Sequence, residues 1–229
     1  MKRRIVIAID GPGGAGKSTI ARRLAAKLKF LYIDSGAMYR AVALWASRQG
    51  AGLSDMLALE QLARASEIGL SSDPTTVSLN GEDITDAIRT PEIAQAASKV
   101  SAIPGVRRAL VDKQREMAEN SSVVMEGRDI GTVVFPAADV KIFLDADPEV
   151  RAARRLRDLE EKAAAVSKEE VLRDLNERDR RDRTRAESPL MQAPDALYLD
   201  SSGLSIEEVE TAILKIIRSR ISNGKEFER

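Results

Sequence analysis

Short apolar runs alternate with helical patterns along most of the chain. Residues Ile5 to Ile9 form an unbroken apolar run rich in β-branched side chains, which is typical of a strand covered on both faces in a parallel sheet. Further strands are expected at residues 31–33, 123–125, 140–144 and 197–199, each ending within a few positions of an acidic residue. The alternation of strands and helices predicts an α/β fold with a doubly wound parallel sheet.

Helical spacing follows the first strand. Ile20, Leu24 and Leu28 recur every four residues and predict a helix that begins near Lys17. The segment after the second strand has a similar core spacing. Two later helices are expected to begin at capping boxes, Ser167-x-x-Glu170 and Ser205-x-x-Glu208.

Two segments interrupt this rhythm. Residues 68–91 combine polar alternation with the turn pair Asn80-Gly81, which predicts a small antiparallel insert away from the main sheet. Residues 151–167 are charged and rich in alanine, and we expect a helical excursion there. No internal repeat and no boundary between independent domains is evident in the sequence.

Composition excludes several kinds of chemistry. The 229 residues contain 36 Lys and Arg, 36 Asp and Glu, and neither His nor Cys. Thiolate nucleophiles, imidazole bases and nearly all zinc sites are therefore excluded. The balanced charge gives no overall attraction to nucleic acid or to an acidic membrane surface, so any anion site must be local. No run approaches the ~20 apolar residues of a membrane helix, and the first apolar run stops at Asp10, so we expect a cytoplasmic protein.

A glycine-rich loop stands between the first strand and the first helix. Gly11-Pro12-Gly13-Gly14-Ala15-Gly16-Lys17-Ser18 satisfies the pattern G-x-x-x-x-G-K-[ST] in the flanking context that this motif requires. Backbone N–H groups of such a loop cradle phosphates beside a helix N-terminus. Lys17 is expected to reach the β- and γ-phosphates, and the Ser18 hydroxyl to hold Mg²⁺. The loop predicts binding of a nucleoside triphosphate.

Arginines point to the phosphoryl acceptor. An acceptor hydroxyl profits from a carboxylate base, whereas an acceptor phosphate is already ionised and must be held by cations. Guanidinium groups suit the second case, because they stay charged and match phosphate oxygens bidentately. Arginines follow predicted strands or recur at helical spacing at Arg40, Arg107, Arg128, Arg178, Arg181 and Arg185. A helix face with internal ion pairs is the alternative for residues 177–185, and the interleaved Asp179 and Asp182 disfavour a helix that binds nucleic acid.

Several strings together resemble the bacterial cytidylate kinase family. They are Ile9 to Thr19, Tyr32 to Arg40, Gly127-Arg128-Asp129-Ile130-Gly131-Thr132, Lys141 to Leu144, and Arg178 to Arg185 followed by Pro189-Leu190. The resemblance covers nearly the whole chain. It implies a fold of the P-loop nucleoside-monophosphate-kinase type with a core of residues 1–67 and 101–229. Residues 68–100 would be an inserted NMP-binding subdomain, and residues 151–168 a lid.

The same resemblance implies transfer of the γ-phosphoryl group of ATP, with Mg²⁺, to CMP or dCMP. The partners would be these small nucleotides, with no nucleic acid and no membrane, and the protein would be a monomer. ATP would be bound by the loop residues Gly11, Pro12, Gly13, Gly14, Ala15, Gly16, Lys17, Ser18 and Thr19, with Ser18 as the metal ligand.

The resemblance also assigns roles on the acceptor side. Ser98, Arg107 and Asp129 would read the cytosine, and Asp182 the ribose hydroxyls. The acceptor phosphate and its surroundings would involve Ser35, Arg40, Arg128, Arg178 and Arg185. Catalysis would rest on Lys17, Arg128, Arg178 and Arg185, with the lid residues Arg151, Arg154 and Arg155 closing over the transferring group.

Two alternatives stay open on the sequence. The chain could be a P-loop kinase for another small acceptor, such as UMP or a hydroxylated metabolite. It could also be a nucleotide-gated regulator or an RNA-binding module without turnover. The asparagine-led string Asn176 to Asp179 lacks the lysine with which GTPases read guanine, so a GTPase is disfavoured.

Overall fold

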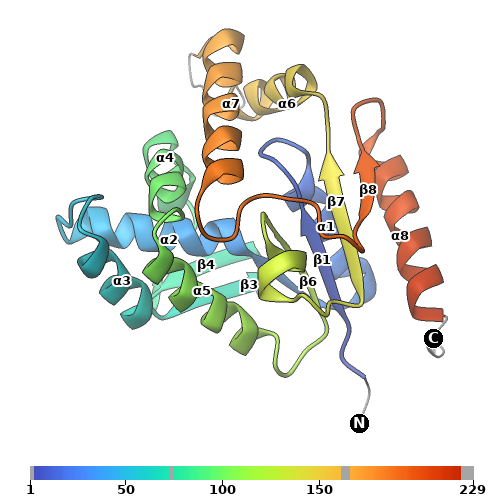
Figure 1. Cartoon of the computed structure of the whole chain (residues 1–229), viewed down its shortest axis with the longest axis horizontal. Helices are drawn as coiled ribbons and strands as arrows, with labels where there is room; N and C mark the ends of the chain where they lie inside the picture. The colour runs from blue at the N-terminus through green and yellow to red at the C-terminus, as the bar shows by residue number, and fades with distance from the viewer. Residues whose placement is uncertain (1–2, 73–74, 161–165, 223–229) are drawn as a thin grey trace.

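The computed structural model describes residues 3–72, 75–160 and 166–222 (Figure 1). Its main sheet has five strands in the order β2 (Leu31–Asp34), β6 (Val123–Gly127), β1 (Val6–Asp10), β7 (Val140–Asp145) and β8 (Leu197–Asp200). All neighbouring strands pair in parallel. The parallel sheet expected from the apolar runs is therefore confirmed, and β1, which leads into the glycine loop, is its central strand.

Helices cover both faces of this sheet. Ile7 and Ile9 on β1 pack in an apolar cluster with α1 (Lys17–Leu28) and α8 (Ile206–Ser222). Ala8, which points to the other face, belongs to a second cluster. That cluster includes residues of α2 (Ser35–Arg48), α3 (Met56–Ala65), α4 (Pro91–Val100) and α5 (Pro104–Met117). This arrangement confirms the doubly wound prediction.

A second, antiparallel sheet lies between α3 and α4 along the chain. It consists of β3 (Ile68–Ser72), β4 (Thr75–Leu79) and β5 (Glu82–Asp83). Asn80 and Gly81 both have positive φ, 51° and 84°, as a tight hairpin turn requires. The sheet is separate in its hydrogen bonding, as expected. Its buried Val77 and Leu79 nevertheless belong to the apolar cluster beneath α2, so the insert shares the main core.

Two helices stand beyond the carboxyl ends of the main strands, α6 (Pro148–Glu160) and α7 (Lys168–Thr184) (Figure 1). The predicted capping box is present, since the Ser167 and Glu170 side chains each accept a hydrogen bond from the other residue's backbone N–H. Ala152 on α6 packs against Val171 and Leu175 on α7. Residues 161–165 of the predicted lid lie outside the described residues. None of the described helices is long and apolar enough to cross a membrane.

Candidate active site

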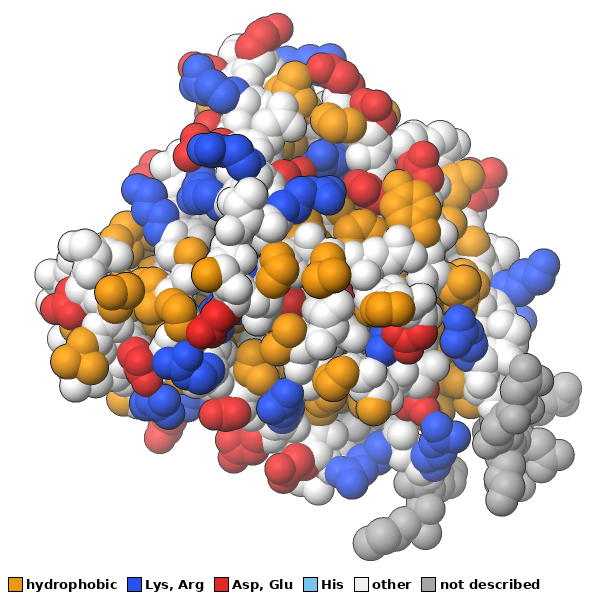
Figure 2. All heavy atoms as spheres, viewed as in Figure 1, with side chains coloured by type: hydrophobic (Ala, Val, Ile, Leu, Met, Phe, Trp, Pro, Cys, Tyr) orange, Lys and Arg blue, Asp and Glu red, His pale blue; other side chains and the backbone are white. Residues whose placement is uncertain are grey.

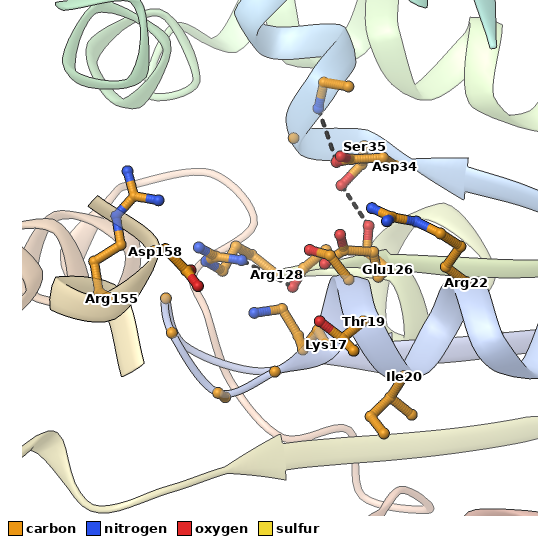
Figure 3. A pocket seen from close by; sticks show the side chains of 18 of the residues that line it. Lys17, Thr19, Ile20, Arg22, Asp34, Ser35, Glu126, Arg128, Arg155 and Asp158 are labelled. Carbon is orange, nitrogen blue, oxygen red and sulfur yellow. Dashed lines mark hydrogen bonds between the residues drawn. The ribbon is translucent and has the colours of Figure 1, made fainter. Parts of the chain in front are cut away.

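A large cavity opens where the strands β1, β2 and β6 end. Its volume is about 1120 Å³, and its walls include residues 13–19 of the glycine loop, α2, α6 and α7 (Figure 3). Sites for one drug-sized ligand typically measure about 300–1,000 Å³, so this cavity is slightly larger than the usual site for one small ligand. Eleven Lys or Arg side chains and five Asp or Glu side chains line its described part.

The positive charge of the cavity contrasts with the rest of the molecule. The chain as a whole has a formal charge of +0. On the face shown in Figure 2, basic and acidic side chains are interspersed. The excess of basic groups is thus a local feature, as an anion site in a neutral protein requires.

The glycine loop forms one end of the cavity. Gly11 has φ +147°, and a Cβ atom there would lie 1.9 Å from the carbonyl oxygen of Leu144 on β7, so only glycine fits. Gly11 and Pro12 lie outside the cavity lining, whereas residues 13–19 line it. The Lys17 ammonium is buried and donates a hydrogen bond to the Pro12 carbonyl (2.6 Å).

Burial perturbs the ionisation of Lys17. Removal from water disfavours the ammonium, the positive charge of Arg128 adds to this effect, and together they lower the pKa of Lys17 to about 7. An anionic ligand beside the ammonium would offset both causes. Binding of a phosphate should therefore stabilise the charged form of Lys17 and raise its pKa.

Acidic and basic side chains alternate at the other end of the cavity. Arg107 on α5 forms a buried ion pair with Asp129, which follows β6. Arg128 donates from Nε to Asp182 Oδ2 on α7 (2.9 Å). Arg185 lies between the two carboxylates, with its Nη atoms 3.6 Å from Asp129 Oδ1 and 3.7 Å from Asp182 Oδ1. Three segments distant in the sequence thus meet in one network.

This network leaves guanidinium donors available for a ligand. Arg185 Nη2 and Arg178 Nε are buried and have no hydrogen-bond partner within the described residues. Burial and the nearby positive charge of Arg128 lower the pKa of Arg178 to about 10. Burial would raise the pKa of Asp182, but the surrounding guanidinium groups outweigh it and hold that pKa below its usual value. Buried donors without a hydrogen bond beside an open cavity indicate an anionic ligand.

Further predicted residues lie around these two ends. Arg40 pairs with Asp34 at the start of α2, with Nη2 to Oδ2 at 2.9 Å. The Ser35 hydroxyl donates to the Glu126 carbonyl (2.7 Å). Arg154 on α6 donates to the Ser201 carbonyl (2.6 Å) and hydroxyl (3.0 Å). Arg155 also lines the cavity, across the glycine loop from Asp34 and Glu126 (Figure 3).

Three acidic residues, two of them buried and one half-buried, were missing from the predicted site. Asp10 ends β1 and accepts hydrogen bonds from the backbone N–H groups of Ile130 and Gly131, at 2.8 and 2.7 Å. Burial raises the pKa of Asp10 to about 6. Asp34 at the end of β2 pairs in register with Glu126, the penultimate residue of β6, and both line the cavity. Burial and the charge of Asp34 raise the pKa of Glu126. The acidic residue near the end of each apolar run was the signal that could have found them.

Comparison with known proteins identifies the family. The family model for cytidylate kinase matches residues 7–219. The chain belongs to the cytidylate kinase family. A cytidylate kinase of Solibacter usitatus is 62% identical over 99% of this chain and 97% of its own length. A cytidylate kinase of Pelotomaculum thermopropionicum is 50% identical over 96% of each chain.

One solved structure supports the fold of this cytidylate kinase family member. An uncharacterized protein from Eubacterium ventriosum superposes with a TM-score of 0.55 over 94% of this chain and 99% of its own, at 13% sequence identity. At that identity the likeness concerns the fold alone. It covers nearly the whole length of both chains.

Two buried residues singled out by the resemblance to cytidylate kinases are not part of the cavity lining. Ser98 on α4 is buried outside the lining, and its hydroxyl accepts a hydrogen bond from Arg181 Nη1 (3.0 Å). Arg151 is also buried, with its guanidinium bound to Asp179 and to backbone carbonyls. The expectation that Arg151 closes over the transferring group therefore does not fit its position, because its donors are already committed.

Proposed function

We propose that the protein transfers the γ-phosphoryl group of ATP to CMP and dCMP, forming ADP and CDP or dCDP. The observation that carries this proposal is the single cavity that joins the glycine loop to the network of Arg107, Arg128 and Arg185. Two anionic nucleotides placed end to end need a phosphate cage at one end and paired charges for a base and sugar at the other. Membership of the cytidylate kinase family agrees with this acceptor.

On the donor side, loop residues 13–19 would hold the phosphates of ATP. Lys17 would exchange its hydrogen bond with the Pro12 carbonyl for the β- and γ-phosphates, which relieves the cost of burying its charge. Mg²⁺ would arrive as part of the ATP complex, where it neutralises charge on the transferring phosphates. Ser18 is suited to hold the ion, because it lines the cavity together with Glu126, and hydroxyl and carboxylate oxygens are ligands that this hard cation prefers.

On the acceptor side, the network would bind one CMP. Arg107 and Asp129 present donors and an acceptor to the cytosine edge, and Asp182 would accept the sugar hydroxyls. The acceptor phosphate would be held by the guanidinium groups of Arg40, Arg128, Arg178 and Arg185. Ser98, which the resemblance assigns to the base, would exchange its hydrogen bond with Arg181 for one to the cytosine.

The reaction needs no proton-abstracting side chain. A phosphate monoester carries close to two negative charges at neutral pH, so an acceptor oxygen can attack the γ-phosphorus directly. The bond from that oxygen to phosphorus forms, the bond from phosphorus to the bridging oxygen breaks, and ADP leaves with the electron pair. Positioning and charge neutralisation by Lys17, Arg128, Arg178, Arg154 and Arg155 would then supply the catalysis.

We propose that the small sheet belongs to the part that binds the acceptor nucleotide, and that the helices α6 and α7 belong to the lid region. Leu70, Val77 and Ile88 line the cavity from the region 68–100, which supports its assignment as the NMP-binding insert. Arg154 and Arg155 line it from α6, which supports a lid at 151–168. We further propose that the enzyme acts as a monomer, in the cytoplasm with the nucleotide pools.

An acceptor panel tests the proposal. ADP formation from ATP is measured with CMP, dCMP, UMP, AMP and no acceptor. We expect turnover with CMP and dCMP, at least tenfold less with UMP and AMP, and none without an acceptor. Turnover of UMP or AMP with CMP and dCMP idle would show that the acceptor is misassigned. ATP binding without acceptor-dependent ADP formation would favour the non-catalytic regulator.

A further inference from the structure

One buried ion pair at the base of α6 and α7 has no part in the proposed reaction. Arg151 and Asp179 are 4% and 7% exposed, and Arg151 Nη1 donates to Asp179 Oδ2 at 2.6 Å. Arg151 Nε also donates to the Ala146 carbonyl (2.9 Å), after β7. The pair therefore connects α7 to the end of β7, an inner strand of the sheet.

The same two side chains hold both backbone polar groups of one loop residue, Gly13. The Gly13 N–H donates to Asp179 Oδ1 (3.4 Å), and the Gly13 carbonyl accepts from Arg151 Nη1 (3.0 Å). Since both the donor and the acceptor of Gly13 are engaged, the orientation of its backbone is fixed by this ion pair. The Gly13 N–H therefore points toward a carboxylate of α7.

Close packing supports these hydrogen bonds. A Cβ atom at Gly13 would lie 3.2 Å from Leu175 Cδ2 on α7, and one at Gly14 would lie 3.0 Å from the Arg151 carbonyl oxygen on α6. Glycines at these two positions thus let the outer side of the loop touch both helices. The loop is therefore held by contacts with α6 and α7, in addition to the strand β1 and the helix α1 that flank it in the sequence.

We propose that Arg151 and Asp179 are positioning residues, which hold the glycine loop in register with the acceptor groups on α7. Asp179 is flanked on the same helix by Arg178 and Asp182, which line the cavity. The proposal rests on the proposed function for the identity of the two nucleotides. A buried ion pair gains little net stability over apolar side chains of similar size, so its geometric role is the property to test.

Three variants and one control separate loop positioning from general damage. Asp179→Asn keeps the shape but leaves the Arg151 charge unpaired. The double variant Arg151→Gln with Asp179→Asn buries no unpaired charge and so protects the fold. Arg151→Lys is the conservative variant, which keeps the charge but not the forked contacts. Asp174→Asn changes an exposed carboxylate on the same helix and serves as the control.

Calorimetry with ATP alone and with CMP alone gives the readout, and thermal unfolding monitors the fold. We expect the ATP Kd to rise roughly 10- to 100-fold in Asp179→Asn and in the double variant, because a small misplacement of a binding loop is costly. The rise should be smaller in Arg151→Lys and absent in Asp174→Asn. The CMP Kd should stay within about twofold, because Asp182 and Arg185 are held by their own partners.

Two results would overturn the inference. One is an ATP Kd within about twofold of the parent in the folded double variant. The other is an equal loss of ATP and CMP affinity, because the pair would then support α7 as a whole rather than the loop. Binding needs no turnover, so a protein that bound ATP but failed the acceptor panel would refute the proposed function and leave this inference standing.

Discussion

Replacing Lys17 by methionine should abolish turnover and stabilise the ligand-free protein. Methionine has a similar length and no charge, so it removes the ammonium that would neutralise the transferring phosphate. It also removes the cost of burying that ammonium. The substitution should therefore lower activity and raise stability, and both effects follow from the buried position of the Lys17 ammonium.

The size of the stability effect follows from the pKa of Lys17, which falls from 10.5 to about 7. A tenfold change in an ionisation constant corresponds to about 1.4 kcal/mol, so burial of this group costs the fold about 4 kcal/mol at pH 7. Methionine also loses the hydrogen bond to the Pro12 carbonyl, which lowers the stability of the variant by about 1–3 kcal/mol and offsets part of this gain. The variant should therefore be more stable by about 1–3 kcal/mol, which raises the Tm by about 5 °C for a chain of this size.

The pH dependence provides an internal check. The unfolded chain binds more protons at this site than the folded protein between pH 7 and pH 10.5, so the stability of the parent rises with pH in that window. The stability gap between Lys17→Met and the parent should shrink by about 2 kcal/mol from pH 7 to pH 9.

Thermal unfolding at the two pH values, with exposed Lys215→Met as the control, measures this gap. A variant less stable than the parent at pH 7, or one that retained turnover, would refute the reasoning.

Two further substitutions probe the acceptor site and the loop. Arg107→Ala should raise the KM for CMP at least tenfold with little change for ATP, and should lower stability by about 3–5 kcal/mol, because Asp129 then stays buried without its partner. Kinetics and urea unfolding against exposed Arg108→Ala measure both effects, and an unchanged KM for CMP would contradict the assignment. Gly11→Ala should destabilise by at least about 2 kcal/mol, because its Cβ would collide with the Leu144 carbonyl. Gly52→Ala, at an open position, should change unfolding little, and equal stability of the two variants would count against the close approach.

Local sequence was sufficient wherever a residue's role depends on its neighbours in the chain. The apolar run at residues 5–9 gave a central strand, and the glycine loop followed it directly. The capping boxes at Ser167 and Ser205 begin α7 and α8 as predicted, because such caps involve residues only three positions apart. The antiparallel hairpin at Asn80-Gly81 was found for the same reason.

Roles that depend on distant partners were harder to predict. Arg151 and Arg154 are three residues apart in one charged run, yet one is buried against Asp179 and the other lines the cavity. Only the packing of α7 against α6 separates them. Likewise, Asp10 acts through the backbone of Ile130 and Gly131, whose approach depends on the neighbouring strands β1 and β6. Spacing along the chain contains no information about either contact.

The central place of β1 has a consequence for synthesis of the protein. Its partners β6 and β7 begin at Val123 and Val140, so the first strand to leave the ribosome must wait for more than half of the chain before it can pair. Such long-range pairing slows folding and leaves an apolar segment exposed meanwhile. The glycine loop, although encoded at the very beginning, thus cannot acquire its final surroundings until more than half of the chain has been synthesised.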